Sequence, residues 1–565
     1  MTLFQRIIFV SIIIGLGLNQ FYSCNHNIPV KEKQQELEVA QISADKINPG
    51  DTTFPGGRGA NQMVIYTPEY GDSTGTNQWG LEATIRNDTV VSVTGNNSEI
   101  PDMGFVISGH GQMQKWISQN LFPGIIVKRE GAKITALANT DSYLFQSRHL
   151  LNKAKYLQNQ KYSTPYLVID SINNIYQNLV NLSQRSRQEN DSQDAKRYSQ
   201  EALQKAREIY YYSFPSRTEE IRACWMRIRS KSPQGLEETV KNIKALGFNT
   251  ICPETIYGGY TIYPNSIESL NQNPQFKGWD PLQELSVLCD KYDIRLVPWV
   301  WVFFIGNKNS PLIEEKRNWM GKSRKGEIYS RIEQGYHFFC PARKEVHKFW
   351  LAVYKDLLQN YDLDGLQLDY IRYPVSLPYE LGYCYCDHCR TDFQKISGYD
   401  PISITPEKNP EAWNEWSNYC MEQINSFVKS VSVLKDSLAP HVELSADVFP
   451  DSESSKASKF QNWPLWLEKN YLDEIFTMSY TPAVERVGIQ SKLLKQNLSP
   501  EIKGYVGLGP FMGFSAEVLL EEIYKAQQAG VDGICLFNYS NLSKEQIEAL
   551  QKGSFRKTAQ RPDEL

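Results

Sequence analysis

The stretch Asp364-Gly-Leu-Gln-Leu-Asp-Tyr-Ile-Arg-Tyr-Pro374 carries the clearest structural signal in the chain. It has the pattern of a short buried strand that follows a turn and ends at a proline. Successive strand side chains point to opposite faces. One face therefore carries Leu366, Leu368 and Tyr370, and the other carries Gln367, Asp369 and Ile371. The leucines suit packing against helices. We therefore expect Gln367 and Asp369 to point inwards.

This strand is one of eight strand candidates between residues 215 and 542, at 222–229, 248–256, 294–304, 365–373, 442–449, 474–481, 503–509 and 533–539. Helices are predicted between them at 235–246, 282–291, 346–359, 411–437 and 518–529. The first two follow Ser-Pro and Asp-Pro, which are helix-start signals. Eight βα units favour a (β/α)8 TIM barrel over residues 216–546. A doubly wound open sheet is the alternative, but no glycine-rich phosphate turn follows the first strand.

The chain before the barrel shows two further patterns. Residues 51–140 contain short alternating apolar runs separated by turn signals, which predicts a small, mostly β domain. Residues 141–215 carry apolar residues at helical spacing and are predicted to form a helical linker. Residues 547–565 are predicted to be a C-terminal tail. The predicted fold class is therefore α/β, a TIM barrel preceded by a small β domain and a helical linker.

The N-terminus has the features of an export signal. Residues 7–18 (IIFVSIIIGLGL) are apolar but too short to span a bilayer, which predicts a signal peptide at 1–23. Ser23-Cys24 resembles a loose bacterial lipoprotein box, so we expect lipidation of Cys24 and a polar membrane tether at 24–50. A plain cleaved signal and a retained anchor are the alternatives. The predicted location is the bacterial cell envelope.

Composition limits the partners of the protein. The 60 Lys and Arg residues nearly balance the 64 Asp and Glu residues, for a net charge of −4. This balance argues against a nucleic-acid partner. The 12 Trp, 32 Tyr and 24 Phe residues suit sugar rings, although aromatic residues are also common in cores. The expected partners are a polysaccharide and, through the lipid anchor, a membrane.

Two strand candidates end with an acid on the inward face. Asp447 in Val442–Pro450 holds the position that Asp369 holds in its own strand, and reacting groups in such barrels lie at these strand ends. Glycoside hydrolysis commonly needs one carboxylic acid and one carboxylate, and a like-charged neighbour keeps one of them protonated. We therefore predict Asp369 and Asp447 as the catalytic pair. The alternatives are an ion pair between Asp369 and Arg372, and loop capping by Asp447.

Polar and aromatic residues near the other strand ends are candidates for substrate binding. Arg372 would orient Asp369 or bind a substrate oxygen, and Glu254 ends the second strand as a third acid. Glu485 is a weaker fourth acid. Rings can stack on sugar faces while amides and hydroxyls bind sugar hydroxyls, although each residue could also serve in packing. The set comprises Trp299, Trp301, Tyr480, Asn538 and Tyr539.

Several motifs together resemble the glycosyl-hydrolase-like family 10 of exported bacterial proteins over about residues 220–545. They are Phe248-Asn-Thr-Ile251, Tyr263-Pro264-Asn265, Asp280-Pro281-Leu282, Phe339-Cys-Pro-Ala342, the stretch 364–374, and Met478-Ser-Tyr-Thr481. The resemblance implies a glycosidase barrel with Asp369 at the characteristic acidic position and no cofactor for the chemistry. A characterised relative cleaves peptidoglycan glycan strands that have lost their stem peptides. Peptidoglycan glycan is therefore the expected substrate.

The alternative to a hydrolase is a protein without catalytic activity. The barrel could be catalytically degenerate, in a glycan-binding or envelope-tethering lipoprotein without turnover. The fold alone does not distinguish this hypothesis from that of a hydrolase.

A cysteine cluster raises the question of a metal. Cys384, Cys386 and Cys389 have C-x-C-x-x-C spacing, which can supply three corners of a tetrahedral zinc site. The fourth ligand would be Cys340, Cys420 or His388. A disulfide and free packed thiols are the alternatives. A zinc ion here would brace the long loop after the fourth strand and would not act on substrate.

Overall fold

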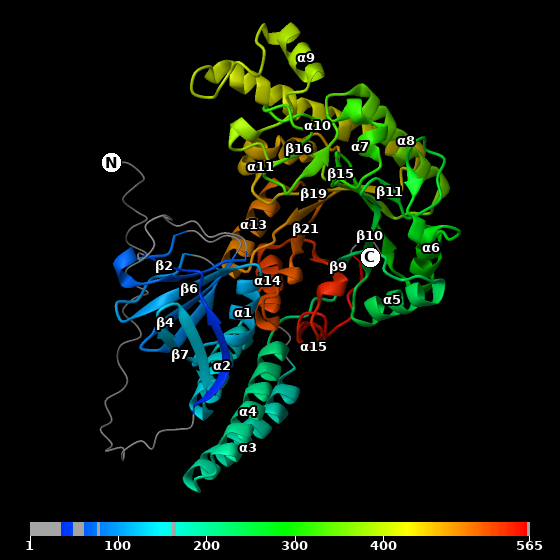
Figure 1. Ribbon diagram of the computed structural model, residues 1–565. Helices are drawn as coiled ribbons and strands as arrows, with labels where there is room; N and C mark the ends of the chain where they lie inside the picture. The colour runs from blue at the N-terminus through cyan, green and yellow to red at the C-terminus, as the bar shows by residue number, and fades with distance from the viewer. Residues whose placement is uncertain (1–35, 49–60, 76–79, 96, 161–164, 562–565) are drawn as a thin grey trace, which may run out of the picture.

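The computed structural model describes residues 36–48, 61–75, 80–95, 97–160 and 165–561. The predicted signal peptide and Cys24 lie outside these residues. In the described ranges, no helix is both long enough and apolar enough to cross a membrane. Figure 1 shows a small β sheet beside a large closed barrel, with a group of long helices below both.

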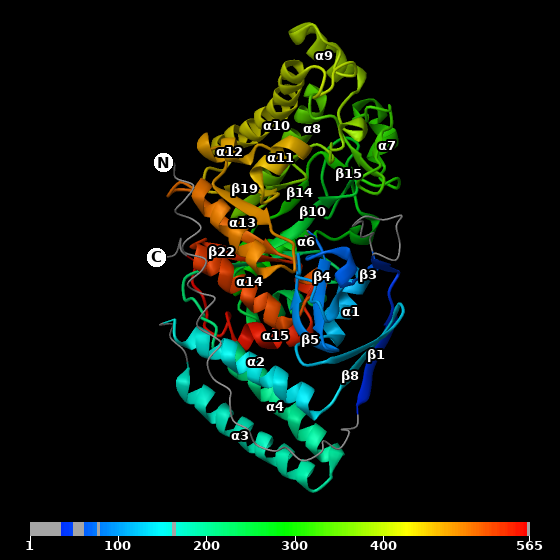
Figure 2. The ribbon, with the colours of Figure 1, turned by 90° about the vertical axis from the view of Figure 1, so that its left-hand side faces the viewer.

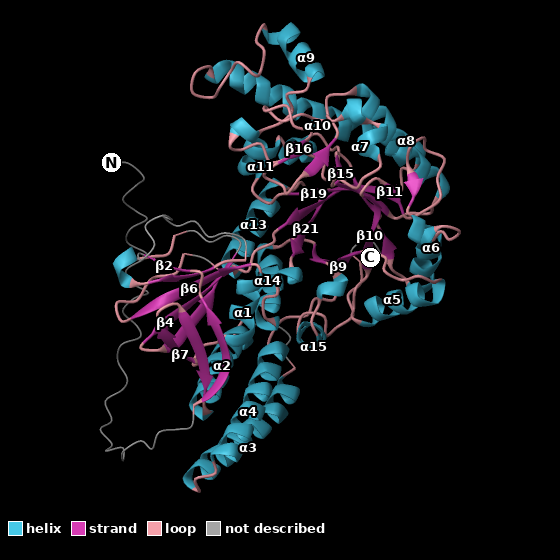
Figure 3. Ribbon diagram, in the orientation of Figure 1, coloured by secondary structure: helices cyan, strands magenta, loops and turns pink. Residues whose placement is uncertain are grey.

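The barrel is a ring of eight parallel strands, which Figure 3 shows surrounded by helices. Each strand pairs with the next along the chain, and the last pairs back onto the first. The predicted (β/α)8 barrel is confirmed, and every strand overlaps a predicted range. The strands are β9 (Ile221–Met226), β10 (Thr250–Tyr257), β14 (Trp299–Trp301), β18 (Gly365–Asp369), β19 (Glu443–Val448), β20 (Glu474–Met478), β21 (Lys503–Leu508) and β22 (Gly533–Phe537).

The third strand of the ring is interrupted. A separate short piece, β13 (Arg295–Leu296), pairs with β10 just before β14 begins. Pro298 lies between the two pieces and cannot donate a ladder hydrogen bond, although its carbonyl accepts one from Gln367 N at 2.9 Å. The predicted strand 294–304 is thus present in two parts.

An outer layer of helices covers the ring. It comprises α5 (Pro233–Ala245), α6 (Pro281–Tyr292), α8 (Lys344–Asn360), α10 (Pro410–Leu438), α13 (Val484–Asn497), α14 (Ala516–Ala529) and α15 (Lys544–Lys552). Of these, α13 and α15 were not predicted. The loops after the strands add α7 (Leu312–Glu315), α9 (Asp387–Ser397), α11 (Ser452–Lys459) and α12 (Trp463–Glu468). They also add the short strands β11 (Tyr260–Thr261), β12 (Asn271–Gln272), β15 (Phe304–Gly306), β16 (Tyr329–Ser330) and β17 (Tyr336–Phe338).

The inside of the ring is filled in layers. Trp225, Cys252, Trp299, Phe476 and Tyr505 form an apolar cluster of inward-facing side chains, separate from the core under the helices. Below them lies a charged base, where the buried Arg295 guanidinium donates to both carboxylate oxygens of Glu474, at 2.8 and 3.0 Å. Arg295 also pairs with Glu443. The interior is therefore a packed core and not a pore.

In the part of the small domain that the structure describes, eight strands form one mostly antiparallel sheet, in the order β1-β8-β7-β5-β4-β6-β3-β2. Helix α1 (Gln112–Asn120) packs against it through Ile117. The strands are β1 (Leu37–Ser43), β2 (Lys46–Asn48), β3 (Met63–Tyr66), β4 (Gly80–Arg86), β5 (Thr89–Thr94), β6 (Gly104–His110), β7 (Ile126–Glu130) and β8 (Lys133–Ala138).

Two boundaries differ from the predicted ones. Strands β1 and β2 fall within the predicted tether 24–50, because β1 is an edge strand whose apolar residues Leu37 and Val39 remain exposed. Helix α15 crosses the predicted barrel boundary at 546. Residues after it also pack on the barrel, since the buried Arg222 donates to the carbonyls of Ser554 and Lys557.

The predicted helical linker consists of three long helices, α2 (Thr140–Gln158), α3 (Tyr166–Gln188) and α4 (Ser192–Tyr212). Figure 2 shows α2 and α4 beside α14 and α15. Tyr210 on α4 donates to Glu521 on α14 at 2.6 Å, and Lys153 on α2 pairs with the same carboxylate at 2.8 Å. The small domain meets the barrel through Gln114 of α1, which donates to the Met512 carbonyl after β21 at 2.9 Å. Both preceding regions are therefore anchored to the barrel.

The charged base of the barrel predicts a specific stability defect. Arg295→Ala leaves the fully buried Glu474 without its cation, so we expect a loss of about 3–5 kcal/mol in the free energy of unfolding. Urea denaturation at neutral pH measures it. Lys291→Ala, which removes an exposed ion pair with Glu237 on the barrel surface, is the control and should change stability far less. Equal effects of the two substitutions would contradict a structural role for the base.

Candidate active site

Three acids lie on inward positions near the C-terminal ends of barrel strands, two of them on adjacent strands. Asp369 is the last residue of β18, Asp447 lies near the end of β19, and Glu254 lies on β10. Strands β18 and β19 pair in register up to Leu368 and Ala446, so Asp369 and Asp447 occupy the next matching positions. Adjacent strands are about 4.8 Å apart. The structure therefore brings the two predicted catalytic acids side by side at the mouth of the barrel.

Asp447 is the most strongly perturbed of the three acids. Its side chain is buried, and its Oδ1 has no hydrogen-bond partner among the described residues. Burial, and then the negative charge of Asp369, raise the pKa of Asp447 well above its ordinary value. Burial therefore favours the protonated form of Asp447.

Asp369 is also buried, but a hydrogen bond and a nearby positive charge partly offset its loss of hydration. Its Oδ1 accepts a hydrogen bond from the backbone N–H of Tyr370 at 2.6 Å. Burial raises the pKa of Asp369 to about 7, while this hydrogen bond and the Arg372 charge act in the opposite direction. Tyr370 has φ +49°, a left-handed conformation that is uncommon for a non-glycine residue and is found at functional sites. At neutral pH Asp369 can therefore exist in either protonation state.

Glu254 is paired with a cation that lies partly in solvent. Its Oε1 accepts from Arg227 Nη2 at 3.0 Å, and its Oε2 lies 2.5 Å from Arg227 Nε. Burial nevertheless raises the pKa of Glu254 to about 7, because it outweighs the opposing effect of Arg227. Glu254 also raises the pKa of Asp369, so the two acids share one electrostatic environment.

Arg372 forms its ion pair with Glu333 and not with Asp369. Its guanidinium donates to both carboxylate oxygens of Glu333, at 2.7 and 3.3 Å, and to the Tyr373 carbonyl at 2.9 Å. Glu333 in turn accepts from Val375 N at 2.7 Å. Arg372 therefore joins the loop after β18 to the β16–β17 turn. Its charge still lowers the pKa of Asp369.

An aromatic wall stands beside the acids. The Trp301 ring stacks on Phe304 with centroids 4.6 Å apart, and Phe304 stacks on Tyr336 at 4.4 Å. Tyr370 and Tyr257 meet the Trp301 ring edge-on at 5.5 and 6.0 Å. Trp301, Tyr336, Tyr370 and Tyr257 are all partly exposed, unlike the fully packed Phe304. They offer ring surface next to Asp369.

The remaining predicted binding residues are distributed unevenly. Trp299 and Gln367 pair in register one layer below Asp369. Trp299 Nε1 and Gln367 Nε2 have no hydrogen-bond partner among the described residues. Tyr480 packs on Trp225 and Phe537 at the opposite side of the mouth. Asn538 is buried and accepts from Ser540 at 2.8 Å, while Tyr539 is half-buried after β22.

Glu485 lies apart from the others. It is exposed on α13 and pairs with Lys525 of α14 at 2.8 Å, so it is outside the mouth.

Sequence reasoning missed several residues of the site, which are Arg227, Glu333, Trp225 and the ring residues Tyr257, Tyr336 and Tyr370. Arg227 and Glu333 lie in loops far from their partners along the chain, and no spacing rule connects them. Trp225, whose Nε1 donates to Gln367 Oε1 at 2.8 Å, could have been found because it stands at an inward position near the end of the first strand.

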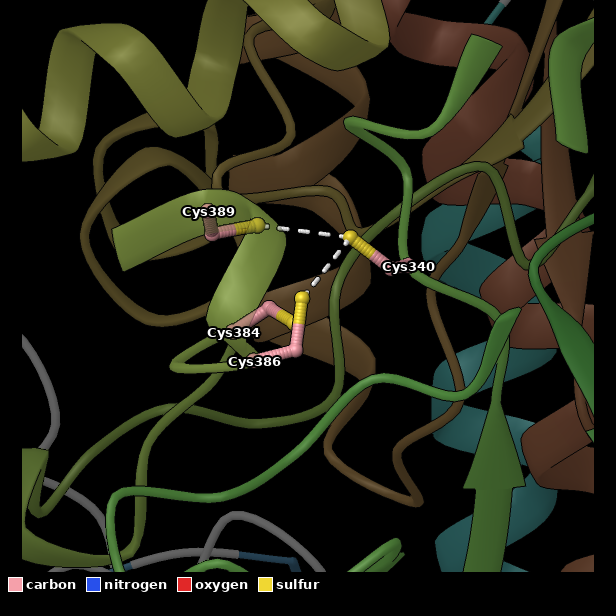
Figure 4. Close-up of side chains that lie close together, drawn as sticks. All are labelled: Cys340, Cys384, Cys386 and Cys389. Atoms are coloured by element: carbon pink, nitrogen blue, oxygen red, sulfur yellow. Dashed lines mark hydrogen bonds between the residues drawn. The ribbon is translucent and has the colours of Figure 1, made fainter. Parts of the chain in front are cut away.

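The structure also places the predicted cysteine cluster. Cys384, Cys386 and Cys389 meet Cys340, and their four sulfur atoms lie within 4.8 Å of one another (Figure 4). His388 instead places its Nε2 3.0 Å from the Ala342 carbonyl oxygen, and Cys420 is buried in α10 outside this group.

The closed barrel, with acids grouped at its C-terminal mouth, has the architecture of a glycoside-hydrolase-like TIM barrel. A family model described as glycosyl hydrolase-like 10 matches residues 220–514, and the chain belongs to this family. The resemblance found in the sequence is thereby confirmed.

Known structures show similar folds at low identity. The PgaB (BpsB) glycoside hydrolase domain of Bordetella bronchiseptica is 12% identical, with a TM-score of 0.48 over 59% of this chain and 98% of that domain. The catalytic domain of β-amylase from Paenibacillus polymyxa is 12% identical, with a TM-score of 0.44 over 60% of this chain and 98% of that domain. No curated protein matches the sequence. The barrel assignment stands on the strand pairing of this chain.

The perturbed acids predict a pH-dependent stability difference. The pKa of Asp369 is about 7 in the folded protein and near 3.9 in an unfolded chain, so the folded state binds the additional proton between these values. The stability that this group contributes is present below about pH 4 and is lost as the pH rises through 7. The free energy of unfolding of Asp369→Asn should therefore be about 1–3 kcal/mol higher than that of the wild type at pH 8. At pH 4, where Asp369 is protonated in the wild type, this advantage should disappear.

Thermal or urea unfolding of both proteins from pH 4 to pH 8 measures this difference. Glu485→Gln is a matched control, since it removes an exposed acid. Its difference from the wild type should stay nearly constant with pH. A constant difference for Asp369→Asn as well would show that this acid is not perturbed in the folded protein.

Proposed function

We propose that this protein is a glycoside hydrolase that cleaves a polysaccharide, with the glycan strands of peptidoglycan as its substrate. The observation that carries the proposal is the side-by-side placement of Asp369 and Asp447, two buried acids on adjacent barrel strands. Their pKa values are raised to different extents, which separates their protonation states at neutral pH. Such a separation is what acid and nucleophile roles require.

The two acids have distinct roles in this proposal. Asp447 keeps its proton and donates it to the oxygen of the leaving sugar. Asp369 ionises more readily and attacks the anomeric carbon as the nucleophile, held by the Tyr370 N–H. When Asp447 has given up its proton, it can take one from the water that releases the product. Glu254 and Arg227 set the electrostatic environment and bind substrate oxygens at the edge of the mouth.

The lining of the mouth supports a sugar polymer as the ligand. Partly exposed rings of Trp301, Tyr336 and Tyr370 can stack on the apolar faces of sugars. Buried polar atoms below the acids, Trp299 Nε1 and Gln367 Nε2, can donate to sugar hydroxyls. The choice of peptidoglycan glycan rests on the family, one characterised member of which cleaves peptide-free strands.

The location proposed for this activity is the cell envelope. Residues 1–23 carry the composition of a signal peptide, and Cys24 stands where a lipoprotein is acylated. A lipid on Cys24 would hold the enzyme at a membrane facing its cell-wall substrate. Metabolic labelling with a fatty-acid analogue would detect this modification, and Cys24→Ser would abolish it.

Substitution of the acids tests the reaction directly. Asp369→Asn should reduce kcat by about 1,000-fold or more, and Asp447→Asn by about 100- to 10,000-fold, in reducing-end release from peptide-free glycan strands. Glycosides with a dinitrophenyl leaving group need no protonation. They should restore most of the rate of Asp447→Asn and none of that of Asp369→Asn.

A panel of polysaccharides assayed in parallel identifies the substrate, with Glu485→Gln as a variant that keeps wild-type activity. A wild-type protein that binds glycan strands but releases no reducing ends, with the same affinity in Asp369→Asn, would establish the alternative function of a non-catalytic glycan-binding lipoprotein.

The pH profile tests the proposed electrostatics. The rising limb of kcat/KM should report ionisation of Asp369 near pH 7. Glu254→Gln removes a like charge from the neighbourhood of Asp369 and leaves Arg227 as an unpaired cation. Both changes lower the pKa of Asp369, so the rising limb should move to lower pH. An unchanged limb, or one moved to higher pH, would contradict the proposed coupling.

A further inference from the structure

Four cysteines meet in the loops above the barrel. Cys340 follows β17, Cys384 and Cys386 precede α9, and Cys389 lies in the first turn of that helix. All four side chains are buried, with at most 1% of each residue exposed. In Figure 4 their sulfur atoms point toward a common centre. The five other buried cysteines of the described chain lie within strands or helices of the barrel and its outer layer.

The spacing of the sulfur atoms fits a metal better than a covalent bond. Cys340 Sγ lies 3.3 Å from Cys389 Sγ and 3.6 Å from Cys386 Sγ. All pairs among the four lie within 4.8 Å. A disulfide requires about 2.05 Å. Four sulfurs at about 2.3 Å around a tetrahedral zinc ion are about 3.8 Å apart, which is close to the two distances above and below the 4.8 Å limit.

We propose that Cys340, Cys384, Cys386 and Cys389 bind one structural zinc ion. Each thiol loses its proton on binding, and neither sulfur nor metal changes oxidation state. Four protein ligands complete the coordination of zinc and leave no position for water or substrate. The ion therefore has a structural role, and this inference does not depend on the proposed hydrolase activity.

The site joins two loops that have little regular structure of their own. One runs from β14 to α8 and contains Cys340, and the other runs from β18 to α10 and contains the remaining three ligands. Neighbouring contacts join the same loops, since Tyr385 N donates to the Lys322 carbonyl at 2.8 Å and Arg324 N to the Gly382 carbonyl at 3.0 Å. A metal supplies cross-linking energy where a loop cannot build a large core.

The two braced loops begin at the strands that carry Trp301 and Asp369. The Arg372–Glu333 ion pair links them again close to the acids. Zinc would thus stabilise one wall of the barrel mouth, although the metal site itself lies away from the reacting groups. Loss of the metal should loosen both loops together and leave the barrel strands intact.

Metal analysis of the purified full-length protein tests the site. After passage over a chelating resin, the wild type should retain about one zinc ion per chain, and its X-ray absorption spectrum should show four sulfur neighbours at about 2.3 Å. Cys340→Ser and Cys386→Ser should each retain less than a tenth of that zinc. Cys289→Ser is the matched control, since Cys289 is equally buried in α6, and it should retain the wild-type amount.

The wild-type spectrum keeps the test decisive if the serine variants do not fold. A wild type without bound metal would overturn the proposal, as would zinc bound without sulfur neighbours. Disulfides among these four cysteines, found by alkylation and mass spectrometry of the exported protein, would also overturn it.

Discussion

A carboxyl group enclosed by a ring of eight parallel strands loses most of its hydration, and the account of this protein depends on that loss. Inward positions on a closed barrel have no access to bulk water except at the mouth, so an acid placed there ionises only where a cation or donor compensates it. Asp447 has an oxygen without any such partner among the described residues. Its neighbour Asp369 has one backbone donor, and this hydrogen bond and the Arg372 charge both lower the pKa of Asp369.

The two ends of the barrel deal with buried acids in opposite ways. At the base, Arg295 neutralises Glu474 through two hydrogen bonds, and Tyr505 adds a third at 2.6 Å. Those groups are fully satisfied and serve stability. At the mouth, the nearest cations do not pair with Asp369 or Asp447, since Arg372 binds Glu333 and Arg227 binds Glu254. The acids of the mouth therefore keep the raised pKa values that a catalytic pair requires.

Much of the barrel could be predicted because its signals are local. Alternation within each strand placed Gln367, Asp369 and Asp447 on the inner face, and the structure places them there. The edge strand β1, whose Leu37 and Val39 remain exposed, was missed, as was helix α13, whose buried face includes Gly488, Gln490 and Ser491. Contacts between distant segments have no local signal. The pairing of Arg372 with Glu333, 39 residues away, and the approach of Cys340 to the cluster 44 to 49 residues later depend on how two long loops fold over the mouth.

The anomeric form of the first product tests the pairing of Asp369 with Asp447 most directly. Carboxyl groups on adjacent strands, about 4.8 Å apart at the backbone, match the separation of about 5–5.5 Å in retaining glycosidases. Glu254 lies two strands from Asp369, a spacing nearer to the inverting class. Proton NMR during cleavage of peptide-free glycan strands should therefore show the anomer of the substrate linkage appearing first. The opposite anomer would contradict Asp447 as the partner of Asp369 and indicate Glu254 instead.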